Sequence, residues 1–248
     1  MNTCKIIAHR GANKYAPQNT MPAFERANEL GVDGFETDVH LTRDGHPVIC
    51  HNYTVNETSN GMGSITSYDL EQIRRLDFGS YYSDKFKGTT IPTLEEFLTF
   101  CETADISTMN IELKSPAAKE TDIVEKTITA VHEHGLFNKL LISSFDYRLL
   151  IRCKEVDPLT KTAYLYSPDK PDSYKMMFTP VKFAKKIGAE YLHPMYSYVT
   201  PAYVRAAHAE GIKVNVWTVD SAPLIKYMLR CGVDGIITNC PDRVKSYL

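Results

Sequence analysis

The sequence lacks CxxC cysteine pairs and any large excess of charge of one sign. Its six cysteines are scattered without a CxxC pair, which argues against a zinc cage and a disulfide scaffold and favours reduced, mostly buried thiols. Lysine and arginine total 28 against 30 aspartates and glutamates, so there is no basic field to gather nucleic acid or an anionic membrane. Nucleic acid is therefore not expected as a partner.

The sequence also has little that would take it into or across a membrane. The apolar run before His9 and Arg10 spans a few residues, too short for a signal-peptide core or a membrane span. Neither a basic amphipathic segment nor a lipid-anchor motif is evident. We therefore expect a cytoplasmic protein without stable membrane insertion, and the sequence does not indicate an oligomeric state.

What the sequence does contain is a regular alternation of short β-branched runs and longer amphipathic stretches, typical of βα units around a parallel sheet. Eight strands are expected, over residues 5–9, 34–39, 109–114, 140–143, 161–166, 190–193, 213–218 and 235–238. Helices are expected near 20–30, 93–103, 119–134, 146–155, 174–187, 200–210, 221–230 and 241–247. With 248 residues and no GxGxxG or Walker A motif, the chain predicts an α/β fold, one TIM barrel, (β/α)8, spanning 1–248 as a single catalytic domain.

The repetition is interrupted after the second predicted strand. Residues 42–45, Thr-Arg-Asp-Gly, predict a tight turn, followed by an extra short strand over 47–51. Residues 52–92 then precede the next helix, and loops of that length are usually functional or disordered. This one carries six aromatic residues, which predict a folded cap: Tyr53, Tyr68, Phe78, Tyr81, Tyr82 and Phe86. Such a cap could bind substrate, cover barrel surface or form a subunit contact.

Two predicted strands carry charged residues along one face. Glu36 and Asp38 lie two positions apart and so point to the same side, and in strand 109–114 Glu112 and Lys114 alternate with an apolar face. Strands of a parallel barrel are covered on both faces, so this alternation indicates a polar face in a wet mouth. The carboxyl ends of barrel strands form the catalytic face, where we expect these side chains to meet.

Three converging carboxylates, Glu36, Asp38 and Glu112, could not all stay ionised without a cation. Oxygen-only ligands suit Mg²⁺ or Ca²⁺, with Mn²⁺ a further candidate, so the sequence predicts one divalent metal ion. The simpler alternative is a solvated strand end beside an ordinary Glu112–Lys114 ion pair. The joint occurrence on two alternating strands makes that account the weaker one.

Two histidines, His9 and His51, fall at predicted strand ends and could reach the same mouth. Although a lone histidine is more often structural, a pair on opposite sides of a phosphodiester could serve as base and acid, each near its useful pKa at neutral pH. Arg10, through its bidentate fork, and Lys114, as a point charge, would bind the phosphoryl oxygens. Such a set of residues would suit the chemistry of a phosphodiester.

The motifs resemble a known family when they are taken in order. They are His9-Arg10-Gly11, Pro17-Gln18-Asn19-Thr20, Glu36-Thr37-Asp38-Val39, Leu41-Thr42-Arg43-Asp44-Gly45, His51, Glu112-Leu113-Lys114 and Val216-Trp217-Thr218-Val219. The set resembles the glycerophosphodiester phosphodiesterases across nearly the whole chain. That resemblance implies metal-dependent hydrolysis of glycerophosphodiesters to glycerol 3-phosphate and an alcohol, on a TIM barrel with a cap after the second strand.

The resemblance also implies roles for individual residues. The implied metal ligands are Glu36, Asp38 and Glu112, the general acid/base pair is His9 and His51, and the substrate-binding residues are Arg10, Lys114, Trp217 and Gln18. Residues of the cap would contact the glycerol end. The family usually has Glu and Asp where this chain has Gln18 and Asn52, so we expect Gln18 to hold Arg10 less firmly and Asn52 to alter the field at His51.

Other functions remain open on the sequence alone. One is a phospholipase or lysophospholipase D-type enzyme acting on lipids, and another is a weakened phosphodiester-binding pseudoenzyme, motivated by Gln18 and Asn52. A Schiff-base aldolase using Lys114 is remoter, because Glu112 beside it would keep the amine charged. Trp217 would also suit a barrel core, and His193, at a predicted strand end, suits either core or mouth. The released alcohol, the preferred metal and a cyclic phosphate intermediate are not predicted.

Overall fold

The computed structural model describes residues 4–114, 122–167 and 179–248. The strands in chain order are β1 (Lys5–His9), β2 (Gly34–Leu41), β3 (Pro47–Ile49), β4 (Thr108–Leu113), β5 (Leu140–Ser144), β6 (Thr162–Tyr166), β7 (Tyr191–Pro194), β8 (Lys213–Val216) and β9 (Gly235–Thr238). The helices are α1 (Met21–Glu29), α2 (Leu70–Ile73), α3 (Leu94–Thr103), α4 (Ile123–Glu133), α5 (Tyr147–Val156), α7 (Pro180–Ile187), α8 (Pro201–Ala209), α9 (Ala222–Cys231) and α10 (Pro241–Lys245). The first residues of the predicted helices 119–134 and 174–187 lie outside the described ranges.

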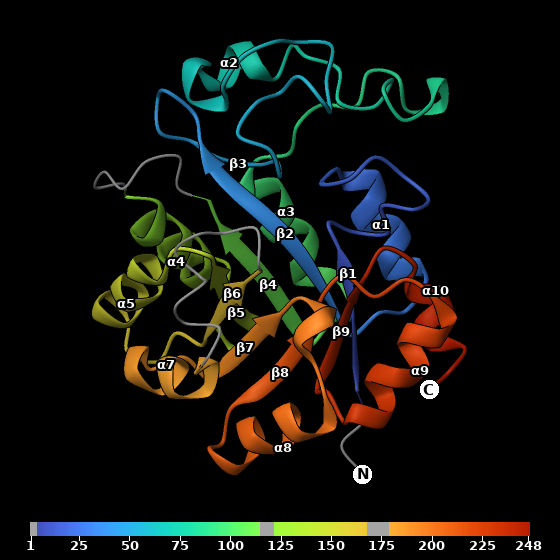
Figure 1. The fold of residues 1–248 in the computed structure, drawn as a ribbon. Helices are drawn as coiled ribbons and strands as arrows, with labels where there is room; N and C mark the ends of the chain where they lie inside the picture. The colour runs from blue at the N-terminus through green and yellow to red at the C-terminus, as the bar shows by residue number, and fades with distance from the viewer. Residues whose placement is uncertain (1–3, 115–121, 168–178) are drawn as a thin grey trace.

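Eight of the strands close into a parallel barrel. The order is β1-β9-β8-β7-β6-β5-β4-β2, and β1 pairs with β2 to complete the circle. The helices surround the strands (Figure 1). The predicted (β/α)8 barrel is thus confirmed, and it places the carboxyl ends of all eight strands at one rim.

The remaining strand, β3, lies outside the barrel order and pairs antiparallel with β2. The predicted tight turn joins the two strands, and in it Gly45 N donates to Thr42 O at 3.0 Å. The extra strand is shorter than the predicted 47–51, because it ends at Ile49 and His51 lies in the loop beyond it. Cys50 N still donates to Asp38 O at 3.0 Å, which keeps this loop beside the end of β2.

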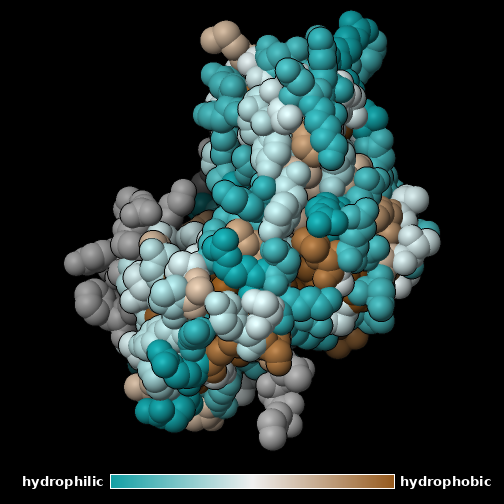
Figure 2. Space-filling view, turned by 90° about the vertical axis from the view of Figure 1, so that its right-hand side faces the viewer, coloured by the Kyte–Doolittle hydropathy of each residue, from teal (hydrophilic) through white to brown (hydrophobic). Residues whose placement is uncertain are grey.

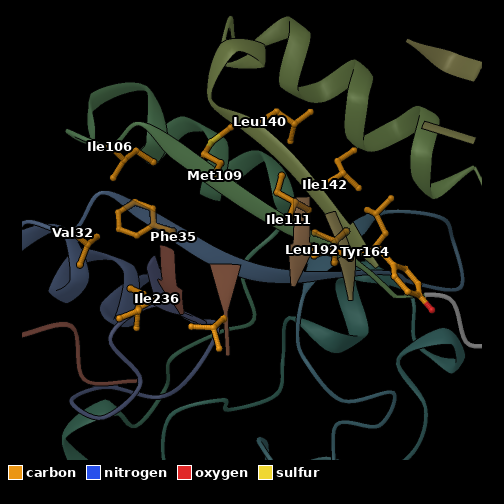
Figure 3. Close-up of a cluster of buried hydrophobic side chains, with 14 of the residues drawn as sticks. Val32, Phe35, Ile106, Met109, Ile111, Leu140, Ile142, Tyr164, Leu192 and Ile236 are labelled. Atoms are coloured by element: carbon orange, nitrogen blue, oxygen red, sulfur yellow. The ribbon is translucent and has the colours of Figure 1, made fainter. Parts of the chain in front are cut away.

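The main hydrophobic core lies between the barrel and its helices. Outward-facing strand residues such as Phe35, Ile111 and Ile142 pack there (Figure 3). Phe24 of α1 lies against Phe35, with ring centroids 5.9 Å apart. Burying one such side chain stabilises the fold by roughly 1.5–3 kcal/mol. Because side chains alternate along a strand, the residues between these core positions point into the barrel.

Helix α1 has Thr20 at its N-cap position and Pro22 in the first turn. The Thr20 side chain does not cap the helix, because its hydroxyl donates to Pro17 O at 2.6 Å. That bond tightens the loop that leads from β1 into α1. The helix ends next to Gly31, whose φ of 66° suits a residue without Cβ.

Residues 52–92 contain α2 and two short 3₁₀ turns, η1 (Ile65–Ser67) and η2 (Asp84–Phe86). Buried residues of this segment form a hydrophobic cluster with Val48 and Cys50 that is separate from the main core. Its members within the segment are Val55, Ile65, Ile73, Phe78 and Ile91. Two tyrosines attach the segment to the loop after β1, since Gln18 N donates to Tyr81 OH at 3.1 Å and Tyr82 OH donates to Lys14 O at 2.6 Å. Figure 1 shows the segment at the end of the molecule toward which β2 points. Its role as a cap stays a prediction.

The face of the molecule drawn in Figure 2 is covered mainly by hydrophilic residues, with hydrophobic atoms visible in small areas between them. Within the residues that the structure describes, no helix combines the length and apolar character needed to cross a membrane.

Candidate active site

Three carboxylates from two neighbouring strands converge inside the barrel. Glu36 and Asp38 come from β2 and Glu112 from β4, and Asp38 lies directly opposite Glu112 in the strand register. One oxygen from each residue lies within 4.8 Å of the others. All three residues are buried, at 5%, 0% and 7% exposed. The side chains that the strand pattern was expected to bring together therefore do meet.

Two cations stand beside these carboxylates. Lys114 Nζ lies 2.9 Å from Asp38 Oδ1 and 2.5 Å from Glu112 Oε1. Arg10 Nε lies 3.5 Å from Asp38 Oδ2. Burial alone would raise the pKa of Asp38, but Lys114 and Arg10 outweigh it and hold that pKa below its usual value. Asp38 is thus the carboxylate that stays ionised.

The turn after β1 aims both the side chain and the backbone of Arg10 at this cluster. Arg10 adopts a φ of 56°, and its backbone N–H donates to Glu36 Oε2 at 2.9 Å. A left-handed conformation in a residue with a side chain is strained, and such strain collects at functional sites. Gly11 follows with a φ of 76°, where a Cβ would lie 2.6 Å from the Ala23 carbonyl carbon. Only glycine lets α1 pack this closely against the turn.

Asn19 orients Asp38 from the same loop. Its Nδ2 donates to Asp38 Oδ2 at 2.8 Å, and its Oδ1 accepts from Thr37 Oγ1 at 2.9 Å. Asn19 is buried and has a φ of 55°. No site role was predicted for Asn19, which entered only as part of the Pro-Gln-Asn-Thr run.

The cluster has the chemistry of a hard-cation site. Three carboxylates face two cations, and burial followed by the charge of Asp38 raises the pKa of Glu36 well above its usual range. Burial also raises the pKa of Glu112 to about 7, although Lys114 opposes the shift. Asp38 Oδ1 lies 2.9 Å from Lys114 Nζ, and a carboxylate oxygen has a second lone pair that can bind an ion. Oxygen donors with surplus negative charge fit a divalent ion such as Mg²⁺ or Ca²⁺.

The two histidines lie at the same rim, each with its Nδ1 next to an asparagine. His9 Nδ1 lies 2.6 Å from Asn239 Oδ1, and His51 Nδ1 lies 2.6 Å from Asn52 Oδ1. Burial, with the charge of Arg10, lowers the pKa of His9 to about 3, and the charge of His51 acts in the same direction. Burial lowers the pKa of His51 to about 4, although Asp38 opposes the shift. Both rings are therefore neutral at pH 7 in this arrangement, whereas the sequence analysis expected pKa values near neutrality.

Comparison with known proteins places this rim in context. The sequence profile of the Glycerophosphoryl diester phosphodiesterase family matches residues 9–243. The chain belongs to this family. It is 40% identical over 237 residues to a glycerophosphodiester phosphodiesterase of Caldanaerobacter subterraneus subsp. tengcongensis, which covers 96% of this chain and 94% of that protein. The family predicted from the ordered motifs is confirmed.

Solved structures agree with this assignment. A crystal structure from Silicibacter pomeroyi has a TM-score of 0.91 at 29% identity and covers 99% of this chain and 92% of that one. An Oleispira antarctica phosphodiesterase, solved in complex with the product sn-glycerol-3-phosphate, has a TM-score of 0.84 at 29% identity and covers 98% of this chain and 95% of that one. The closed barrel of this family member is therefore shared with solved relatives.

Gln18, one of the two departures from the usual family pattern, still holds Arg10. Arg10 Nη1 donates to Gln18 Oε1 at 2.5 Å, because an amide oxygen accepts from a guanidinium as a carboxylate does. What the amide lacks is the negative charge. The second departure, Asn52, likewise supplies an oxygen acceptor, to His51.

The side chains of Trp217 and His193 lie in different surroundings. Trp217 is partly exposed just beyond β8, where its ring stands edge-on to Phe145 with centroids 5.8 Å apart. His193 is fully buried inside the barrel, where its Nε2 lies 3.0 Å from Asn215 Nδ2. Trp217 Nε1 donates to His193 O at 2.7 Å, so the two residues are linked through the backbone. His193 therefore belongs to the interior, and Trp217 to the rim.

Asn239 and Asp220 lie at the same rim and were not predicted from the sequence. Asn239 follows β9 directly, and its N and Nδ2 donate to Asp220 Oδ1 and Oδ2 at 2.8 and 2.7 Å. The available signal was position, because a polar residue just after a barrel strand lies on the catalytic face. That rule led to His9 but was not applied to the last strand.

Proposed function

We propose that this family member hydrolyses glycerophosphodiesters to glycerol 3-phosphate and an alcohol, using a divalent ion held by Glu36, Asp38 and Glu112. The observation that carries the proposal is the convergence of these three buried carboxylates beside Lys114 and Arg10. Family membership and the product-bound relative from Oleispira antarctica support the substrate class. Mg²⁺ and Ca²⁺ are the preferred candidates, followed by Mn²⁺.

We assign substrate binding to the two cationic side chains beside the carboxylates, Arg10 and Lys114. Arg10 would contact the phosphoryl oxygens through its guanidinium, held in place by Gln18, and Lys114 would contact them as a point charge. When bound, the metal ion supplies Lewis-acid stabilisation of the negative charge that builds up on the phosphoryl group. Lys114 and Arg10 add to that stabilisation because they sit in a partly desolvated site.

Proton transfer falls to His9 and His51. One imidazole accepts the proton of the attacking hydroxyl or water at Nε2. The other takes up a proton from solvent at its own Nε2 once the anionic phosphodiester is bound beside it, and delivers that proton to the leaving oxygen. Both rings are held through Nδ1, which leaves the opposite nitrogen of each ring for this task. The arrangement suits attack by water and attack by a neighbouring glycerol hydroxyl equally well.

The organic parts of the substrate would lie against the aromatic residues of the rim. Trp217 would form one wall, beside Phe145. Tyr53 belongs to the segment 52–92. Burial raises the pKa of its hydroxyl, and the charges of Lys114 and Glu112 also act on that pKa, so Tyr53 lies close to the cluster. We therefore assign contacts with the glycerol end to this segment.

The proposal is tested by following phosphorus NMR signals of glycerophosphocholine, glycerophosphoethanolamine and glycerophosphoglycerol with Mg²⁺, Ca²⁺ or Mn²⁺. We expect glycerol 3-phosphate to appear, and Glu112→Gln and His9→Gln to lower kcat/KM by about 100-fold or more. His132→Gln is the matched control, because His132 bonds Asp157 on the outer helices. No turnover of any substrate with any metal would contradict the proposal. A cyclic phosphate signal ahead of the product would assign attack to the glycerol hydroxyl.

Action on intact lipids or lysolipids is the alternative that this experiment should also address. Parallel reactions with lysophosphatidylcholine micelles and with glycerophosphocholine compare the two substrate classes directly. We expect the water-soluble diester to have the higher kcat/KM. The reverse order would reassign the enzyme as a phospholipase of the D type.

A further inference from the structure

Each proposed catalytic histidine is held by an asparagine, and each asparagine is held in turn by a carboxylate. We propose that Asn239 and Asn52 are positioning residues that fix His9 and His51 in the tautomer with the proton on Nδ1, leaving Nε2 of each ring as a proton acceptor. The catalytic consequence rests on the proposed function, but the tautomers themselves do not.

The polarity of the Asn239 amide is fixed from two sides. Its Nδ2 lies 2.7 Å from Asp220 Oδ2, and a carboxylate oxygen can only accept at this contact. The backbone N–H of Asn239 donates to the other oxygen of Asp220 at 2.8 Å, so the carboxylate is itself anchored. The amide nitrogen must therefore face Asp220, and the amide oxygen must face His9.

A second asparagine confirms this orientation independently. Asn13 Nδ2 lies 3.0 Å from His9 O, a backbone carbonyl that can only accept, and 2.7 Å from Asn239 Oδ1. Because the Asn13 nitrogen is fixed as a donor, the atom of Asn239 that it meets is an oxygen. That same oxygen lies 2.6 Å from His9 Nδ1, which must then carry a hydrogen.

The same reasoning applies to His51, in the loop after β3. The Asn52 side chain donates to the carboxylate of Glu57, which also accepts from Thr54 Oγ1 at 2.9 Å. The Asn52 nitrogen therefore faces Glu57, and its Oδ1 lies 2.6 Å from His51 Nδ1. The ring nitrogen again has to donate. Two unrelated loops thus produce the same histidine–asparagine–carboxylate arrangement.

This arrangement decides what each ring offers to the substrate. A neutral imidazole carries a single N–H, so a ring that donates through Nδ1 presents a lone pair at Nε2. An amide oxygen orders the ring without adding the negative charge of a carboxylate. Loss of the asparagine would free the neutral ring to carry its proton on Nε2. The base could then not accept the substrate proton there, and the acid could not be loaded there with the proton that it delivers, so kcat falls more than KM changes.

The tautomers can be read directly from the long-range ¹H–¹⁵N spectra of ¹⁵N-histidine-labelled full-length protein at pH 8, assigned with His9→Gln and His51→Gln. We expect His9 and His51 to show a protonated Nδ1 and an unprotonated Nε2. A protonated Nε2 for either ring in the unmodified protein would overturn the assignment for that ring. The spectrum needs no turnover, so it can fail or succeed independently of the proposed reaction.

Two variants test the asparagines separately. Asn239→Leu should shift His9 toward the Nε2-protonated form and leave His51 unchanged, while Asn52→Leu should do the reverse, so each is the matched control of the other. We expect each to lower kcat by about 10- to 100-fold with little change in KM. Asn52→Asp keeps the oxygen acceptor and should retain the tautomer of His51, because the exposed Glu57 can turn away. A folded leucine variant whose ring keeps its wild-type tautomer would overturn the positioning role.

Discussion

Lys114 and Asp38 form an ion pair inside the barrel, with Nζ 2.9 Å from Oδ1 and both side chains less than a tenth exposed. Lys114 also contacts Glu112, so one ammonium serves two of the three carboxylates. In the absence of a divalent ion this ammonium balances charge that would otherwise be buried without a counterion. The pair therefore links the stability of the barrel to the site proposed for the metal.

Lys114→Met should destabilise the metal-free protein, because removing one partner of a buried pair typically costs about 3–5 kcal/mol. For a chain of this size the melting temperature should fall by about 10 °C. Mg²⁺ or Ca²⁺ should raise the melting temperature of this variant more than that of the wild type, since the ion replaces the lost charge. Thermal unfolding with and without metal measures both effects.

Lys154→Met is the control for that experiment. Lys154 pairs with Glu190 away from the carboxylate cluster and is partly exposed. Its loss should cost about 0–1 kcal/mol and should leave the response to metal unchanged. Equal metal-induced shifts in the wild type, Lys114→Met and Lys154→Met would argue against a metal site beside Lys114.

Replacing Gln18 by Glu and Asn52 by Asp together should change kcat/KM by less than about tenfold, or about 1.4 kcal/mol. The reason is that both amide oxygens already accept the hydrogen bonds that a carboxylate would accept, from Arg10 and His51. Steady-state kinetics on the best glycerophosphodiester gives the answer. An increase of about 100-fold would instead identify the native chain as a weakened binding protein.

The sequence predicted the barrel because each strand and helix is encoded locally. Alternation in Glu36-Thr37-Asp38 placed two carboxylates on one face, and pairing of β2 with β4 then brought Glu112 opposite Asp38. The family followed from motifs that occur in order and is confirmed. Strand periodicity was enough for the barrel, and the resemblance of the ordered motifs was enough for the family.

What the sequence did not predict depends on contacts between distant loops. Asn239 meets His9 across 230 positions, and no local pattern marks such a contact. The extra strand was predicted too long because Val48, Ile49 and Cys50 look alike as strand residues, whereas antiparallel pairing with β2 ends at Ile49. The low pKa values of both histidines arise from burial, which the sequence does not reveal.

His134, which lies outside the active site, should make the free energy of unfolding depend on pH. Its ring nitrogens lie 2.6 Å from Glu102 and 2.8 Å from Glu95, and the hydrogen bond to Glu95 raises the pKa of His134. A raised pKa means that the stabilisation is complete below the unfolded value near 6.5 and is lost as pH rises through the folded value. Urea unfolding should therefore find His134→Gln less stable than wild type by about 0.5–1 kcal/mol at pH 5.5, and equal to it at pH 8.5. A difference of the same size at both pH values would refute this account.

Ile73→Ala should loosen the segment 52–92 without loosening the barrel. Ile73 is fully buried in the separate cluster with Phe78 and Ile91, and such a truncation typically costs about 2–5 kcal/mol. Hydrogen exchange should accelerate within 52–92 and stay unchanged in β4 and β5, and kcat/KM should fall because Tyr53 is displaced from the rim. Ile128→Ala, in the main core, is the matched control and should spare the segment. Faster exchange throughout the barrel in Ile73→Ala would show that the two clusters are not independent.

The most direct measurement is calorimetric titration of the metal-free protein with Mg²⁺, Ca²⁺ and Mn²⁺, alongside Glu112→Gln and the His132→Gln control. The account predicts one ion per chain in the wild type and the control, and affinity lower by about tenfold or more in Glu112→Gln. The same titration should restore hydrolysis in parallel with binding. Undiminished binding in Glu112→Gln, or full hydrolysis in the metal-free wild type, would contradict the three-carboxylate site.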